Sequence, residues 1–141
     1  MQDRIVLDTN VLIAAVRSRR GASWRLLSLI GTGQFEISIS VPLILEYEAV
    51  LLKQMDKSTM DRGDLNGLLD YLVSEAHHQE IYFLWRPQSR DPKDDMVLEL
   101  AVASGANRLV THNVRDFRAA RDFDVRVVTP GSYLFDLGTR P

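Results

Sequence analysis

The chain has 141 residues, which suits one globular domain with a substantial core and is too short for two such domains. Its 17 basic and 19 acidic residues leave a formal net charge of −2, so bulk positive charge cannot be what holds a polyanion. Cysteine is absent, which excludes disulfides, a thiolate nucleophile, cysteine-ligated zinc and iron–sulfur clusters, and this is typical of a reducing compartment.

Neither a membrane span nor a secretory signal is predicted. No apolar run approaches the ~18 residues that a spanning helix needs. The first ten residues carry Asp3, Arg4 and Asp8 around a short apolar run, which is typical of a strand rather than of a signal peptide. We therefore expect a cytoplasmic protein without a membrane partner.

Short β-rich runs alternate with helical patterns along the chain. In chain order we predict a strand at 5–7, helices at 11–16 and 22–30, a strand at 35–39, helices at 42–55 and 60–76, a strand at 81–84, a helix at 92–104, and strands at 108–111 and 125–128. Thr9 or Asn10 is expected to cap the first helix, and Asp91 to cap the helix that starts at Pro92 and closes at Gly105. This alternation predicts an α/β fold with a mostly parallel sheet.

Oxygen-bearing side chains follow several of these elements. In an open parallel sheet the carboxyl ends of the strands flank the crevice where ligands bind, so such residues are expected at one edge. They are Asp8 after the first strand, Glu46 in the helix after Pro42, Asp94 and Asp95 in the first turn after Pro92, and Asn113 and Asp116 after the strand ending at Thr111.

Gathered carboxylates repel one another unless a cation neutralises them. Mg²⁺ or Mn²⁺ is the natural cation for oxygen ligands, and such ions activate water for phosphodiester hydrolysis. The spacing alone remains compatible with acids that are merely scattered over an α/β surface.

Several segments resemble the PIN domain, and most closely the small stand-alone PIN proteins proposed as toxins of toxin–antitoxin systems. The segments are IVLDTNVL at 5–12, Glu46 with Val50-Leu51, RDPKDD at 90–95, LELA at 98–101 and VTHN at 110–113. The resemblance runs from Ile5 to roughly Val128. It implies one PIN-like domain over 1–141, a three-layer α/β/α sandwich, and a Mg²⁺- or Mn²⁺-dependent endoribonuclease. It also implies an antitoxin partner and a homodimer.

The resemblance assigns the acids residue by residue. Asp8 matches the first family acid and Glu46 the second. The third is Asp94 or Asp95, and the helix favours Asp94, which shares a face with apolar residues expected to pack on the sheet. At the fourth position many relatives have an aspartate where this chain has Asn113, so Asp116 becomes a substitute ligand. Asp8, Glu46 and Asp94 are thus the predicted catalytic residues and metal ligands, with Asn113 and Asp116 as further ligands.

The remaining predictions concern neighbours of these acids. Thr9, Asn10, Asp95 and Thr111 are expected to orient the carboxylates or the bound water. Two sets of arginines are expected near the acidic pocket, where they would attract RNA phosphates, although a solvated surface explains any single one as well. These arginines are Arg17, Arg19 and Arg20 in one set, and Arg115, Arg118 and Arg121 in the other.

Other function classes fit less well. A phosphoacceptor receiver domain needs an acidic pair after its first strand and a lysine after its fifth, but the chain has no lysine beyond Lys93. A phosphatase of the Asp-x-Asp type is disfavoured because Asn10 occupies the second place. The alternative that stays open is a catalytically weak PIN scaffold that binds RNA or a partner, because Asn113 is neutral.

Overall fold

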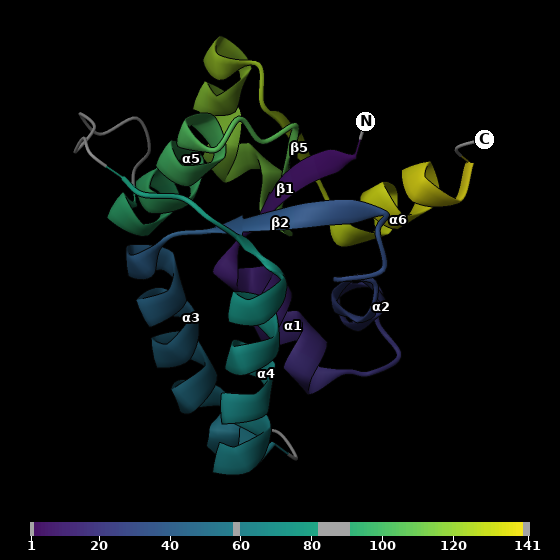
Figure 1. The fold of residues 1–141 in the computed structure, drawn as a ribbon, viewed down its shortest axis with the longest axis vertical. Helices are drawn as coiled ribbons and strands as arrows, with labels where there is room; N and C mark the ends of the chain where they lie inside the picture. The colour runs from purple at the N-terminus through teal and green to yellow at the C-terminus, as the bar shows by residue number, and fades with distance from the viewer. Residues whose placement is uncertain (1, 58–59, 82–90, 140–141) are drawn as a thin grey trace.

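A five-stranded sheet, whose strands all run parallel, forms the centre of the molecule (Figure 1). This computed structural model describes residues 2–57, 60–81 and 91–139. The strands are β1 (Asp3–Leu7), β2 (Phe35–Ile39), β3 (His77–His78), β4 (Arg108–Val110) and β5 (Arg126–Val128), in the order β3-β2-β1-β4-β5. The prediction of an α/β fold with a mostly parallel sheet is therefore confirmed.

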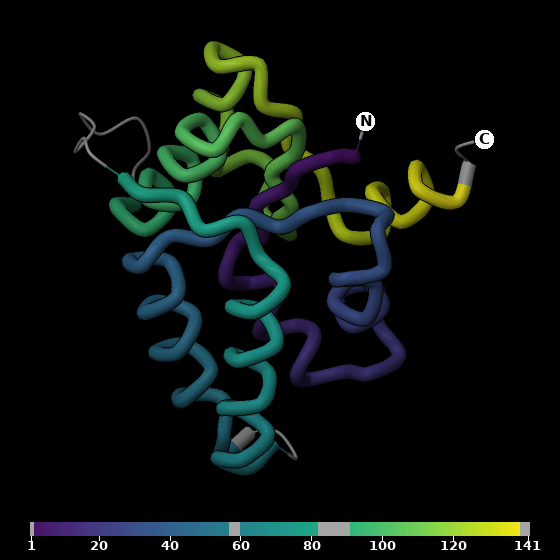
Figure 2. The backbone as a smooth tube through the Cα atoms, in the orientation of Figure 1, coloured from purple at the N-terminus to yellow at the C-terminus, as the bar shows by residue number. Residues whose placement is uncertain are grey.

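Helices cover both faces of this sheet, so the predicted three-layer sandwich is confirmed as well (Figure 2). The helices are α1 (Thr9–Arg17), α2 (Ala22–Ser28), α3 (Val41–Gln54), the 3₁₀ helix η1 (Met55–Lys57), α4 (Arg62–Glu75), α5 (Pro92–Ala103), the 3₁₀ helix η2 (Val114–Phe123) and α6 (Pro130–Thr139). α1 to α4 pack together on one face, where α6 joins α2, whereas α5 and η2 pack on each other over the opposite face. No helix within the described ranges has the length and apolar character to cross a membrane.

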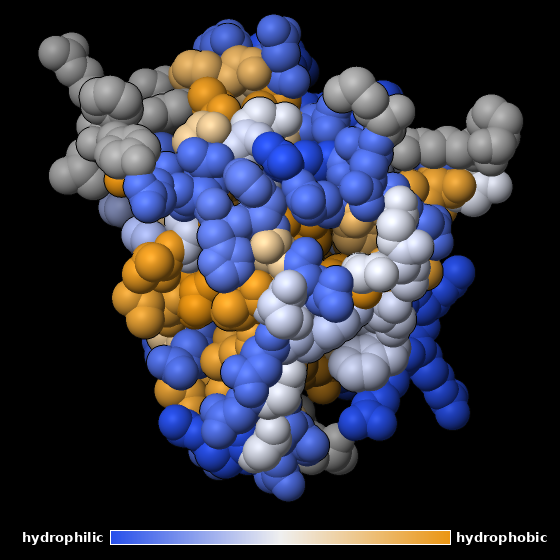
Figure 3. Space-filling view, in the orientation of Figure 1, coloured by the Kyte–Doolittle hydropathy of each residue, from blue (hydrophilic) through white to orange (hydrophobic). Residues whose placement is uncertain are grey.

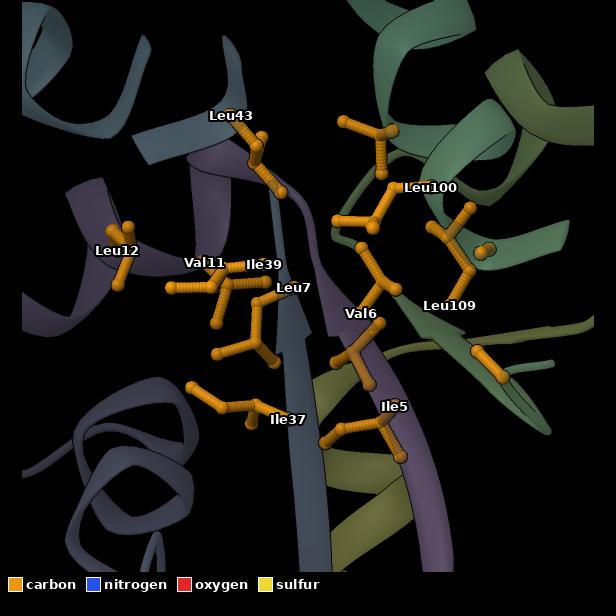
Figure 4. Packing of buried hydrophobic residues seen from close by; sticks show 14 of the residues in the cluster. Ile5, Val6, Leu7, Val11, Leu12, Ile37, Ile39, Leu43, Leu100 and Leu109 are labelled. Carbon is orange, nitrogen blue, oxygen red and sulfur yellow. The ribbon is translucent and has the colours of Figure 1, made fainter. Parts of the chain in front are cut away.

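The central strand β1 is buried on both faces. Ile5, Val6 and Leu7 are each at most 1% exposed. Figure 4 shows Leu7 beside Val11 of α1, while Val6 faces the side of Leu100 on α5. A strand that is covered by helices on both sides needs a continuous apolar run, and this is why the sequence places Ile-Val-Leu here without alternation.

The third strand lies earlier in the chain than predicted. β3 is the pair His77–His78, which joins Ser38 and Ile39 of β2, and the predicted strand at 81–84 is not found at Ile81. Residues 82–84 lie outside the described residues. The hydrophobic pattern failed here because a two-residue edge strand is defined by backbone pairing and has too few side chains to form a pattern.

Two elements near the C-terminus were not predicted. η2 is rich in charge, and its 3₁₀ geometry, with a kink at Phe117, does not produce the 3.6-residue apolar period of an α-helix. α6 begins at Pro130, and proline is favoured in the first turn of a helix. The segment is nevertheless too short for its apolar residues to show a clear helical period.

The helix starts were predicted with mixed success. Pro92 opens α5 under the cap Asp91, as expected. For α1 the prediction of Thr9 or Asn10 as cap was wrong, because Asp8 caps the helix and its side chain accepts from the Thr9 N–H. A carboxylate that ends a strand can therefore also start the next helix.

Candidate active site

The order of the strands reverses beside β1. The chain moves from β1 outward to β2 and β3 and then returns to the other side of β1 for β4 and β5. Ligands of open parallel sheets bind outside the carboxyl ends of strands at such a switch point. Leu7 pairs with Val110 at these ends, and the Asp8 N–H donates to the Val110 carbonyl at 2.9 Å. Asp8 and Thr111 thus emerge side by side at the switch point.

Asp8 is a buried carboxylate, only 6% exposed. One oxygen accepts from the Thr9 N–H at 2.8 Å, and the other accepts from the Thr111 hydroxyl at 2.7 Å. Burial raises the pKa of Asp8, and repulsion from Asp116 and Asp91 adds to this, while the two hydrogen bonds pull the pKa down. The net direction is upward, so burial and repulsion together outweigh the two hydrogen bonds.

Thr111 holds this corner together. Its fully buried hydroxyl donates to Asp8 and accepts from Asn10 Nδ2 at 3.1 Å and from the Asn113 N–H at 3.0 Å. The Asn10 carbonyl oxygen in turn accepts from the His112 N–H at 3.2 Å. The residues after β1 and β4 are thereby linked across the switch point by side chains as well as by the sheet.

Asp94 is the second perturbed carboxylate. It lies in the first turn of α5 and is partly buried. Partial burial raises its pKa to about 6, with smaller contributions from repulsion by Asp8, Asp91, Asp116 and Asp95, in that order. Neither Asp8, Asp94 nor Asp116 forms an ion pair with any described residue. Carboxylates from three separate parts of the fold therefore repel one another, and none of the three has an ion-pair partner among the described residues.

Glu46 occupies a different environment in this structure. It lies on α3 with its side chain 16% exposed, and it pairs with Lys93 Nζ at 3.2 Å. Lys93 directly precedes Asp94, so Glu46 reaches the start of α5, but its charge there is matched by the lysine. Sequence reasoning missed this ion pair, which joins two helices far apart in the chain.

Two other neighbours of the acids were missed as site residues. Tyr47 is fully buried, and its hydroxyl donates to the Leu7 carbonyl at 2.5 Å; burial and the charge of Asp8 raise its pKa strongly. It therefore stays a neutral support beneath Asp8. Asp91 was predicted only as a cap, yet its charge acts on both Asp8 and Asp94. The Asp91-Pro92 pair in the sequence could have indicated this role, because a carboxylate that caps a helix lies beside the residues of its first turn, here Asp94.

The donor chemistry of this site fits a hard divalent cation. It offers carboxylate and amide oxygens from Asp8, Asp94, Asp116 and Asn113, and the nearby His112 ring is hydrogen-bonded to Ser23 at 2.8 Å. Within residues 2–57, 60–81 and 91–139, no three His, Asp or Glu side chains are already arranged as a metal-binding group. Asp116 and Asn113 are exposed at the start of η2, where their side chains have room to turn.

The two sets of arginines do not share one location. Arg17 is the last residue of α1, about 13 Å along the helix from the capping Asp8, and it donates to Gln54. Arg19 lies over the Trp24 ring, with 5.3 Å from its guanidinium carbon to the ring centre. The expectation that Arg17, Arg19 and Arg20 lie near the acidic pocket was thus wrong, because they follow the opposite end of α1. Arg115 and Arg118 are on η2, the helix that carries Asp116.

Comparison with known families agrees with this architecture. A family model described as the PIN domain matches residues 4–115, from β1 into the first turn of η2. No curated protein matches the chain. Since the match covers well over half of the sequence, including the switch point and every candidate acid except Asp116, the chain belongs to the PIN-domain family, a family of nucleases.

Proposed function

We propose that the protein is a Mg²⁺- or Mn²⁺-dependent endoribonuclease. The observation that supports this most is that the pKa values of Asp8 and Asp94 are both raised, first by burial and then by repulsion from neighbouring carboxylates that include Asp91 and Asp116. Such an arrangement costs stability unless it serves a cation. Family membership supports a nuclease, and PIN nucleases usually use divalent metals.

Each residue has a proposed task. Asp8, Glu46 and Asp94 hold the ion, with Asn113 and Asp116 as additional oxygen ligands. When bound, a divalent ion supplies a nucleophilic water at neutral pH and stabilises charge on the leaving oxygen. Thr111 and the Thr9 N–H hold the Asp8 carboxylate in one orientation, and Asn10 fixes Thr111. Asp95 is the neighbour that supports Asp94. Glu46 pairs with Lys93 through Oε1 and would offer its other oxygen to the ion.

Cleavage of a mixed RNA pool tests the proposal. We expect cleavage with Mg²⁺ or Mn²⁺, none with EDTA, and a loss on the order of 10²-fold or more for Asp8→Asn and for Asp94→Asn. Asp70→Asn, on the exposed side of α4, is the matched control and should leave the rate unchanged. Equal cleavage by all proteins with and without EDTA would reject the metal mechanism. RNA binding without any cleavage would instead favour the scaffold alternative.

We further propose that the nuclease is the toxin of a type II toxin–antitoxin system and works in the cytoplasm as a homodimer bound to an antitoxin. Support for a protein partner comes from the apolar surface over α3 (Figure 3). Val41 is 75% and Leu45 59% exposed, and both line a hollow of about 690 Å³ between α3 and the β3 edge.

Two measurements test the partner proposals. Expression should arrest growth, and co-expression of a small protein encoded next to this gene should relieve the arrest; if expression has no effect on growth, the toxin role is wrong. Sedimentation at micromolar concentration should show a dimer that Leu45→Glu converts to a monomer. A wild-type monomer under these conditions would remove the dimer.

A further inference from the structure

A second charged surface lies beside the acids, between η2 and β5. η2 and the 124–127 segment enclose a hollow of about 570 Å³. Four of its lining residues are arginines, and we call this surface the arginine groove; its arginines are Arg115, Arg118, Arg121 and Arg126. All four are exposed. In a chain with a net charge of −2, this is a marked local concentration of positive charge.

The positive charge of the groove is only partly offset by the aspartates of the same segment, Asp116, Asp122 and Asp124. None of the four arginines forms an ion pair with a carboxylate in the part of the chain that the structure describes, and Asp124 is the acidic residue in the lining. Exposed arginines commonly form ion pairs with neighbouring carboxylates. The absence of such ion pairs among the described residues leaves the donors turned toward solvent and free for an anionic ligand.

The spacing of the arginines follows from the geometry of η2. A 3₁₀ helix has three residues per turn and rises about 2 Å per residue, so side chains three apart lie on one side at a separation of about 6 Å. Arg118 and Arg121 have this spacing, whereas Arg115 precedes the non-helical Phe117; all three arginines nevertheless line the same hollow. The result is one row of guanidinium groups, which matches the repeated charges of one sugar–phosphate backbone.

The row begins at the candidate active site. Asp116, whose charge acts on Asp8 and Asp94, is the neighbour of Arg115. Because β4 and β5 are parallel, η2 must run from the carboxyl edge of the sheet back to its amino edge. Arg118 and Arg121 therefore lead away from the acids, toward Arg126 at the start of β5.

We propose that the arginine groove binds the backbone phosphates of a single-stranded RNA segment next to the bond that is cleaved. This inference rests on the proposed nuclease function, because it assigns the path of that enzyme's substrate. A single row of cations fits one backbone, whereas a duplex presents two. The acidic site and the basic groove then have separate tasks, with the acids at the reacting phosphate and the arginines at its neighbours.

RNA binding measured without metal tests the groove independently of catalysis. In EDTA, a fluorescently labelled single-stranded RNA should bind Arg118→Ala/Arg121→Ala at least about 10-fold more weakly than wild type, and the slope of log Kd against log salt should fall by about 1.4. Arg25→Ala/Arg62→Ala removes the same charge from exposed positions on α2 and α4 and is the matched control. An equal loss in the control pair would show bulk charge alone and overturn the proposal.

Two further arms complete the test. Arg118→Lys/Arg121→Lys keeps both positive charges and should retain most of the RNA binding. If the alanine pair lowers Tm, the comparison of the lysine pair with wild type replaces it as the test of the groove. With Mg²⁺, most of the loss in kcat/KM of the alanine pair on a long RNA should appear in KM. Poly-glutamate that binds as tightly as RNA would overturn the proposal in favour of an acidic protein partner. If Asp8→Asn keeps full cleavage while the groove variants lose RNA, the metal mechanism fails and the groove stands.

Discussion

At the scale of single residues, Asp8 combines two tasks that are usually separate. Its Oδ1 caps α1, and its Oδ2 accepts from Thr111, so the carboxylate is held in one rotamer at the carboxyl end of β1. Burial opposes its charge, and so do Asp116 and Asp91. The capping bond and the threonine bond offset part of this cost. The carboxylate is thereby oriented before any ligand arrives.

The pH dependence of Asp94 follows from its raised pKa. Its pKa of about 6 in the fold lies above the value of 3.8 for a free side chain, so the fold binds this proton more tightly than the unfolded chain does. The ionised carboxylate consequently reduces stability as the pH rises from about 4 through about 6. Asp94→Asn in EDTA should therefore raise Tm at about pH 7 and leave it unchanged at about pH 4. Asp70→Asn is the control and should leave Tm unchanged at both pH values. If Asp94→Asn raised Tm equally at both pH values, repulsion and burial of the ionised carboxylate would not be the cause.

Thr111→Val removes only the hydroxyl that joins β1 to β4. It leaves an Asp8 oxygen and the Asn10 amide without their partner in a buried place, so the free energy of unfolding should fall by about 1–3 kcal/mol. Urea denaturation measures this. Thr32→Val removes an exposed hydroxyl that bonds locally to Leu29 and should change stability by less than about 0.5 kcal/mol. If both variants lose the same amount, Thr111 does not have the proposed bridging role.

At the scale of elements, α5 shows how one helix can present acids at one end and join the core at the other. Asp91 caps it, and Asp94 and Asp95 lie in its first turn, where the helix dipole favours negative charge. At its other end the Ala106 N–H bonds to the Ala101 carbonyl and the Gly105 N–H to the Val102 carbonyl, with Gly105 at φ +68°. This closure turns the chain directly into β4.

Two glycine-to-alanine changes should have opposite effects. At Gly105 the positive φ disfavours a Cβ, and Gly105→Ala should cost about 1–2 kcal/mol. Gly67 lies inside α4, and a Cβ there would meet no atom within 4 Å, so Gly67→Ala should stabilise by about 0.5–1 kcal/mol. Thermal melts of the two variants check the signs. Destabilisation by Gly67→Ala would show that α4 is not a regular helix at that point.

At the scale of the whole molecule, the C-terminal helix α6 is attached to the core through α2 and through the starts of β1 and β2. α6 packs on α2, and the fully buried Tyr133 meets the Phe35 ring edge-on with 5.8 Å between ring centres. Its hydroxyl donates to Asp3 at 2.8 Å. The chain beyond the family match at residue 115 is therefore part of the core of this protein.

Loss of the Tyr133 ring should be severe. Tyr133→Ala should lower the free energy of unfolding by about 3–5 kcal/mol, because a large buried ring is removed, and Tyr133→Phe by about 1 kcal/mol, through the hydrogen bond. Phe135→Ala on the same helix removes a ring that is 72% exposed and should cost less than about 0.5 kcal/mol. Denaturant titrations compare the three. Equal effects of the two alanine variants would mean that α6 does not pack as described.

The sequence by itself determined the features that depend on short stretches of chain. The apolar run before Asp8 predicted the first strand, the Asp-Pro pair predicted the start of α5, and Gly105 predicted its end. Each of these is specified by neighbouring residues through burial, capping or allowed φ angles. The family resemblance was likewise readable, because its motifs are local, and the PIN-domain match agrees with it.

Only the tertiary structure decided which of these local features meet. The pairing of β1 with β4 brings Thr111 to Asp8, although 103 residues separate them, and the α3–α5 contact brings Lys93 to Glu46. The same packing also determines the two-residue β3, the hollow that Arg115, Arg118 and Arg121 share, and the position of Arg17 away from the acids. Contacts between distant segments arise from how complete elements pack, and no short stretch of sequence contains that information.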